Sequence, residues 1–221
     1  MDLGVGVAAG VVALPVGALA TGFAVAVPAE GSLPRPSLSL LTAHLRTPVT
    51  FAGAAVAALV STILGSVLGA SILMPAYWLC GLFAVVLAIV DIRRGRLPFV
   101  ITAAMYLVSA VAFGAEALVG GDATPLTRAG VGAVVVLVAF LVLALALPGQ
   151  LGLGDVVLLG WVAFSLAWFS WRVAVVGLLA GLIGQALVGA LVRLRSGIGR
   201  TLPLGPVLLL GWLAGVLVTA A

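Results

Sequence analysis

The sequence predicts an all-α integral membrane protein, built as a polytopic bundle of about eight transmembrane helices. Hydrophobic residues make up 64% of the 221 residues and charged residues only 7%, which is outside the range of soluble domains. Apolar runs of about twenty residues, the length that crosses a bilayer, recur from one end of the chain to the other. We therefore expect residues 1–221 to form a single transmembrane domain in the lipid bilayer.

The charges indicate membrane topology and not a nucleic-acid partner. The chain has ten Arg and no Lys, and most of the Arg lie in short gaps between apolar runs. A single Cys80 inside an apolar run allows neither an intrachain disulfide nor a Cys-based zinc site. No nucleic acid and no metal are expected, and the oligomeric state stays open.

The first half of the chain contains four predicted spans. The first follows Asp2 and not the basic residues of a signal peptide, so it is expected to be a retained helix. Pro and Ser residues in segment 28–49 predict a short loop between the first two spans. The predicted spans are about Leu3 to Val27, Thr50 to Leu73, Met74 to Asp91, and Phe99 to Leu118, with the loop Arg93 to Pro98 between the last two.

The second half of the chain contains four more predicted spans, separated by glycine-containing or basic loops. Gly65 and Gly69, and likewise Gly177 and Gly181, have the four-residue spacing that allows close helix packing. The predicted spans are about Gly130 to Leu147, Val156 to Ser170, Val173 to Val192, and Pro206 to the C-terminus, and Trp171 and Arg172 close the second of these.

The placement of Arg predicts the orientation. With both termini outside the cytoplasm, eight Arg lie in cytoplasmic loops and only Arg128 and Arg172 lie outside, as the positive-inside rule requires. The cytoplasmic set is Arg35, Arg46, Arg93, Arg94, Arg96, Arg193, Arg195 and Arg200.

Two carboxylates at membrane edges are the best candidates for chemistry. Asp91 closes the third span, and Asp155 follows Gly152 and Gly154 and opens the sixth. The chain crosses the membrane twice between them, so both lie on the cytoplasmic side. Two close carboxyl groups could share one proton, as in an aspartic-protease dyad. Glycines beside them would let a substrate backbone come close.

Other interpretations of these residues exist. Asp155 could only cap its helix, and Asp91 could pair with Arg93 or Arg94. The single histidine, His44, lies in a polar loop and gives little support to a Ser/His dyad or a metal cluster.

Three segments resemble the motifs of type IV prepilin peptidases, which are GxGD-type intramembrane aspartyl proteases. They are DIRRGRLPFVIT (Asp91 to Thr102), GLGDVVLLG (Gly152 to Gly160) and PLGPVLLLG (Pro203 to Gly211). The resemblance implies that Asp91 and Asp155 are catalytic and cleave prepilin leaders at the cytoplasmic membrane face. The matching motif residues expected to shape the site are Leu97, Pro98, Gly152, Gly154, Pro203, Gly205 and Pro206.

The resemblance also bears on substrates and cofactors. It implies pilin, Flp/Tad-type or pseudopilin precursors as substrates, and the loop 28–49 stands in place of the zinc-binding domain of longer members. Proteolysis needs no cofactor. S-adenosylmethionine, which many members use to methylate the new N-terminus, is expected only if a methyltransferase activity is retained.

Two positions depart from the family pattern, and alternatives stay open. Phe99 stands where Asn or Asp is usual, and Val157 where Lys is usual. They motivate a second interpretation, a catalytically weak or inactive member that acts as a membrane scaffold or assembly factor for pili or secretion. A small-solute transporter is a third interpretation, without the broken-helix or repeat signals expected of one.

Overall fold

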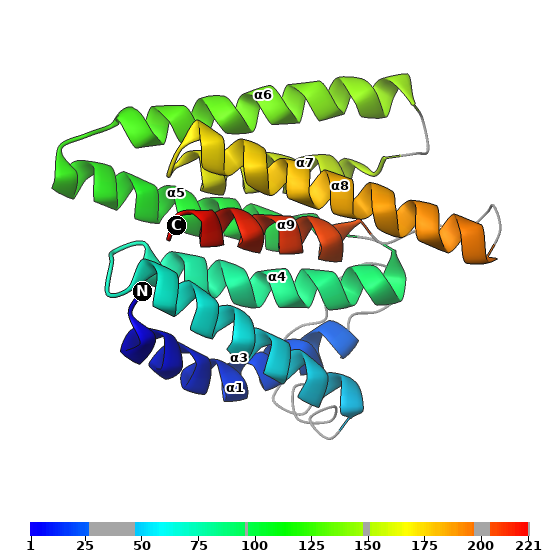
Figure 1. The fold of residues 1–221 in the computed structure, drawn as a ribbon, viewed down its shortest axis with the longest axis horizontal. Coiled ribbons are helices and arrows are strands. Elements are labelled where there is room, and N and C mark those ends of the chain that lie inside the picture. Colours follow the sequence, from blue (N-terminus) through cyan, green and yellow to red (C-terminus); the bar gives the residue numbers. More distant parts are fainter. Residues whose placement is uncertain (27–46, 96, 148–150, 197–203, 221) are drawn as a thin grey trace.

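The computed structural model describes residues 1–26, 47–95, 97–147, 151–196 and 204–220, and within them the chain forms eight α-helices and no strand (Figure 1). The predicted all-α class is confirmed. The helices are α1 (Leu3–Ala26), α3 (Pro48–Leu68), α4 (Met74–Arg94), α5 (Phe99–Gly120), α6 (Thr124–Ala146), α7 (Leu153–Ala167), α8 (Trp171–Ser196) and α9 (Gly205–Val218).

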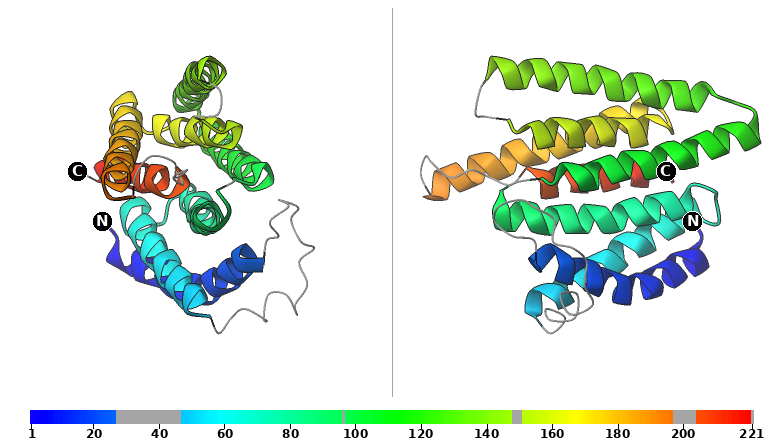
Figure 2. Two further views of the ribbon diagram at one scale, coloured as in Figure 1. Left: turned by 90° about the vertical axis from the view of Figure 1, so that its right-hand side faces the viewer. Right: turned by 180° about the vertical axis from the view of Figure 1, so that it is seen from behind.

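Six of these helices are long and apolar enough to cross a membrane, as expected of a multi-pass membrane protein. The other two, α7 and α9, are apolar but contain only 15 and 14 residues. Both short helices lie inside the bundle, between longer helices (Figure 2). Eleven of the 15 residues of α7 are buried, so this helix forms the centre of the fold.

The helices alternate in direction, and this alternation places the two ends of the bundle (Figure 1). The N-terminus and the C-terminus lie at one end. The other end holds the last turn of α4 and the first turns of α5, α7 and α9. The segments that carry the three sequence motifs are therefore gathered at a single end.

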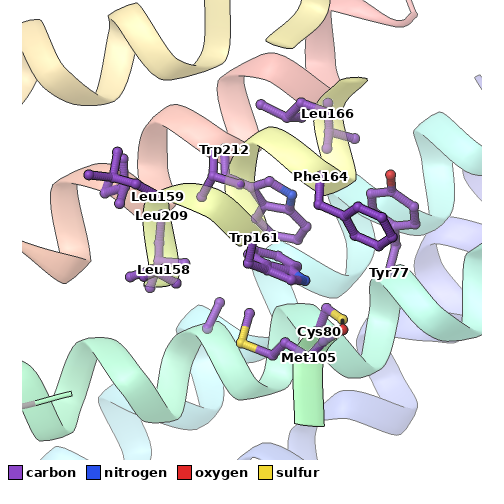
Figure 3. Close-up of a cluster of buried hydrophobic side chains, with 14 of the residues drawn as sticks. Tyr77, Cys80, Met105, Leu158, Leu159, Trp161, Phe164, Leu166, Leu209 and Trp212 are labelled. Atoms are coloured by element: carbon purple, nitrogen blue, oxygen red, sulfur yellow. Dashed lines mark hydrogen bonds between the residues drawn. The ribbon is translucent and has the colours of Figure 1, made fainter. Parts of the chain in front are cut away.

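Aromatic side chains from several helices fill the core around α7 (Figure 3). Trp161 is fully buried, and its indole N–H donates to Ser109 Oγ at 3.2 Å. Its ring lies 5.2 Å from that of Trp212 on α9, which in turn stacks on Tyr77 of α4. The Tyr77 hydroxyl donates to the Ser165 carbonyl at 2.6 Å. The two hydrogen bonds and the contact between the Trp161 and Trp212 rings fix α7 against α4, α5 and α9.

Arg128 of α6 fixes the far end of α7. Its guanidinium donates to the carbonyls of Ala167 at 2.6 Å, Phe169 at 2.9 Å and Trp168. These carbonyls lie at the C-terminal end of α7, where a helix leaves acceptors without intrahelical partners and favours a cation. Arg128 therefore has a structural role that the Arg count alone did not reveal.

The predicted close packing at Gly177 and Gly181 is confirmed. A Cβ on Gly211 of α9 would lie 2.4 Å from the backbone nitrogen of Gly181 and 2.6 Å from the Gly177 carbonyl oxygen, so α8 and α9 touch backbone to backbone. Gly65 packs equally closely, with its Cβ position 2.9 Å from Gly6 Cα of α1. Gly69 is different: it ends α3 with φ 58°, and the packing role expected for it was wrong.

Three predicted boundaries also need correction. The second span ends at Leu68 and not at Leu73, because the positive φ of Gly69 ends the helix. The fifth helix begins at Thr124, six residues before Gly130, with a Pro in its first turn. Trp171 begins α8 and does not close the preceding span.

Candidate active site

Asp91 lies in the last turn of α4 and is held by a distant part of the chain. Its side chain is only 4% exposed. The carboxylate oxygen Oδ2 accepts the backbone N–H of Gly205 at 2.8 Å, from the first residue of α9. The N-terminus of a helix offers unpaired N–H groups and a positive dipole end, both of which suit a carboxylate. The Asp91 side chain is thus positioned by the third motif segment.

Asp155 lies in the first turn of α7 and is held by its own motif. Its Oδ2 accepts the backbone N–H of Gly152 at 3.2 Å, in a capping arrangement with Gly152 in an extended conformation. A Cβ on Gly152 would lie 3.0 Å from this oxygen, so the small residue keeps the arrangement open. The capping interpretation of Asp155 therefore describes a real contact, which also fixes the carboxylate at the end of the bundle.

Leu97 connects the two carboxylate segments. A Cβ on Gly154 would lie 3.1 Å from Leu97 Cβ and 3.3 Å from its carbonyl oxygen. A Cβ on Gly205 would lie 3.3 Å from Leu97 Cδ2 and 3.0 Å from Asp91 Oδ2. Because both glycines lack a side chain, Leu97 fits between the starts of α7 and α9. The spacing of the site thus depends on one leucine and two glycines.

The two carboxyl groups lie at the same end of the bundle, on segments that both contact Leu97. Burial disfavours the ionised form of Asp155, and the negative charge of Asp91 acts in the same direction. Two carboxyl groups that approach closely can share one proton.

The remaining expected site residues have different places. Pro98 precedes α5 with φ −66° and ψ 114°, which starts that helix directly beside the site. Pro206 is in the first turn of α9, where a backbone N–H has no acceptor within the helix, so Pro costs no hydrogen bond there. Pro203 lies outside the described residues, as do residues 28–46 of the short loop.

Two apolar cavities lie near this end of the bundle. One, of about 310 Å³, is formed by α3, α4 and α9 and includes Pro206 and Ile92. The other, of about 520 Å³, lies between α5, α6 and α7 and includes Leu97 and Gly154. The sequence motifs do not include Leu137, Val138 and Leu141 of α6, which also line the second cavity. Nothing in their apolar surroundings distinguishes them in the sequence.

No metal centre is formed by the part of the chain that the structure describes, where no three His, Cys, Asp or Glu side chains gather. The site thus consists of two carboxyl groups, backbone N–H groups and apolar walls.

The fold and the site define a class: a polytopic helical membrane protein with two interacting carboxyl groups at one end of its bundle. Residues 78–219 match the type IV leader peptidase family, and the chain belongs to that family. The matched region includes all three motif segments and every described residue of the site. Neither a curated protein nor a solved structure matches the chain. The family membership confirms the resemblance and supports a peptidase function.

Proposed function

We propose that this protein is a membrane aspartyl endopeptidase that removes the N-terminal leader of prepilin-like proteins. One observation carries the proposal: Asp91 and Asp155, 64 residues apart in the sequence, interact at one end of the bundle. The family match supports a leader peptidase, and the position of two carboxyl groups at one end of the bundle supports the proposed aspartic type.

In the proposed reaction the two carboxyl groups share one proton. The ionised carboxylate takes a proton from a water molecule, whose oxygen attacks the scissile carbonyl carbon. The protonated carboxyl donates a hydrogen bond to the carbonyl oxygen as it gains negative charge. Breakdown of the tetrahedral intermediate breaks the C–N bond, and a carboxyl proton passes to the leaving nitrogen. The products are the leader with a free carboxylate and the mature protein with a free amine, and no cofactor is consumed.

The position of the site suits such a substrate. A prepilin joins a polar leader to an apolar helix, so its scissile bond lies at the membrane surface. The end of the bundle that holds the carboxyl groups is also the end where Arg93 and Arg94 of α4 are exposed. The positive-inside rule supports assigning this end to the cytoplasm. We include pilins, Flp/Tad-type pilins and pseudopilins as substrates, and neither zinc nor S-adenosylmethionine takes part in the cleavage.

The test is leader cleavage by carboxamide variants in membranes. Asp91→Asn and Asp155→Asn keep the size of each side chain but cannot exchange the proton, so cleavage should fall by about 10²- to 10⁴-fold, the range for a lost acid or base. Asp122→Asn is the matched control, because Asp122 is exposed in the loop between α5 and α6 at the opposite end. The readout is the ratio of precursor to mature prepilin on a gel. Full cleavage by both site variants would overturn the proposal.

The scaffold interpretation predicts a different result. A scaffold should bind a prepilin without releasing a leader, so the purified wild-type protein would yield no cleaved product from a prepilin that it captures. Phe99 and Val157 are the features that favour this interpretation.

A further inference from the structure

Phe99 and Val157, the two departures from the family pattern, line the same cavity. Phe99 is the first residue of α5, and Val157 lies in the first turns of α7, two residues after Asp155. Both face the cavity of about 520 Å³ between α5, α6 and α7. Its wall is almost entirely apolar and includes Leu97, Phe99, Leu137, Leu141, Gly154 and Val157. The departures are therefore neighbours in space, in surroundings that suit apolar side chains.

This cavity adjoins the candidate active site. Leu97 and Gly154 belong to its wall, and these two residues touch each other. Leu97 also touches the start of α9 at Gly205, whose N–H binds Asp91. Gly154, Val156 and Val157 of the wall flank Asp155 in the sequence.

Part of the cavity wall lies at the surface of the bundle. Helices α5 and α6 diverge from their connecting loop toward the end that holds the site (Figures 1 and 2). Phe99 and Leu153, which line the cavity, are 64% and 65% exposed. An apolar segment can enter from the bilayer without crossing a polar barrier.

We propose that this cavity receives the first apolar residues after the scissile bond of the substrate, and that Phe99 and Val157 select for them. The proposal rests on the proposed leader peptidase function. A peptide that lies in this cavity has its backbone beside Gly154, the residue that precedes Asp155. The Val157 carbonyl accepts the Tyr106 hydroxyl at 3.2 Å, which fixes the turn of α7 that carries the selecting side chain.

The other apolar cavity provides the comparison. It is lined by Val56 of α3, which is 49% exposed, and by residues of α4 and α9. It includes Ile92 and Pro206 of two motif segments but no residue from 95–99 or 151–157. We assign this cavity to lipid, so that it serves as a matched control surface of similar apolar character.

Crosslinking tests the location. A photoreactive p-benzoylphenylalanine replaces Val157, Phe99 or Val56 in an Asp91→Asn background, which binds the substrate without cleaving it. Each variant is coexpressed with the prepilin that the wild-type protein cleaves best among a type IV pilin, an Flp-type pilin and a pseudopilin. We expect crosslinks at positions 157 and 99, mapped to the first residues after the scissile bond, and none at position 56. Equal crosslinking at all three positions, or crosslinking only at position 56, would overturn the inference.

A kinetic experiment tests the selection. Val157→Trp fills the cavity, and Val56→Trp fills the control surface. Val157→Trp should lower kcat/KM at least ten-fold, because even one added methylene in an apolar pocket is worth about 10- to 200-fold in selectivity. Val56→Trp should stay within about two-fold of wild type. Loss of activity in Val56→Trp as large as in Val157→Trp would contradict the inference.

The inference and the proposed function fail in different ways. If the wild-type protein cleaves none of the three prepilins, the proposed function is wrong and the inference falls with it. If the wild-type protein cleaves a prepilin but positions 157 and 99 give no crosslink, only the location of the substrate is wrong. Phe99 is largely exposed, so its replacement is compatible with folding, and crosslinking from position 99 is a second measurement of where the substrate lies.

Discussion

Gly205→Ala is the most direct test of how the site is positioned. The added Cβ would lie 3.0 Å from Asp91 Oδ2 and 3.3 Å from Leu97 Cδ2. Ordinary van der Waals contact begins near 3.4 Å, so the carboxylate must move by a few tenths of an ångström away from α9. The same movement lengthens the 2.8 Å hydrogen bond from the Gly205 N–H.

The expected effect on cleavage follows from that hydrogen bond. A hydrogen bond to a charged group contributes about 1.5–3 kcal/mol, and about 1.36 kcal/mol corresponds to a factor of ten in rate. If the bond acts fully in the transition state, kcat/KM for leader cleavage should fall by about 10- to 150-fold. The assay is cleavage of a prepilin by the purified protein in detergent, with initial rates measured over a range of substrate concentrations.

Gly130→Ala is the matched control, because a Cβ there meets nothing within 4 Å. Its activity should equal that of wild type. Wild-type activity in Gly205→Ala, together with an inactive Asp91→Asn, would refute the idea that the start of α9 positions Asp91. Equal losses of activity and of thermal stability would indicate misfolding, which a melting curve of each variant distinguishes from a local effect.

Two further predictions concern the fold. Gly211→Ala should lower the free energy of unfolding in detergent by about 1–3 kcal/mol, because a Cβ 2.4 Å from the Gly181 nitrogen must push α8 and α9 apart. An unchanged melting temperature would show that the helices are not in backbone contact. Arg128→Leu removes the hydrogen bonds to the end of α7 and should lower the free energy of unfolding by about 1.5–3 kcal/mol. Arg172→Leu, at an exposed position, should change it little. Equal effects of the two substitutions would contradict the capping role of Arg128.

Hydropathy and the number of predicted membrane crossings outlined the site from the sequence. Counting the crossings between Asp91 and Asp155 placed both at one membrane face before any contact was known. The structure gathers both carboxylates at one end of the bundle, where Asp91 acts on Asp155. The catalytic roles of the two residues stay predictions that the variants above test.

The contacts inside the site were beyond the reach of the sequence. The hydrogen bond from Gly205 to Asp91 joins residues 114 positions apart, and the fit of Leu97 between Gly154 and Gly205 depends on how three helices are rotated. Nor did Phe99 and Val157, as separate departures from a motif, indicate that they share a cavity.

The sequence by itself determined that the chain is a helical membrane protein, roughly where its helices lie, and which carboxylates share an end. These properties depend on local apolar content and on the number of crossings, both of which can be read along the chain. Only the tertiary structure decided which apolar side chains face the core and which face the lipid. Leu158 is fully buried and Leu141 is 41% exposed, yet both are leucines in apolar helices. In a bilayer, core and surroundings are equally apolar, so helix rotation is set by close contacts such as Gly181 with Gly211 and leaves little trace in the hydrophobic pattern.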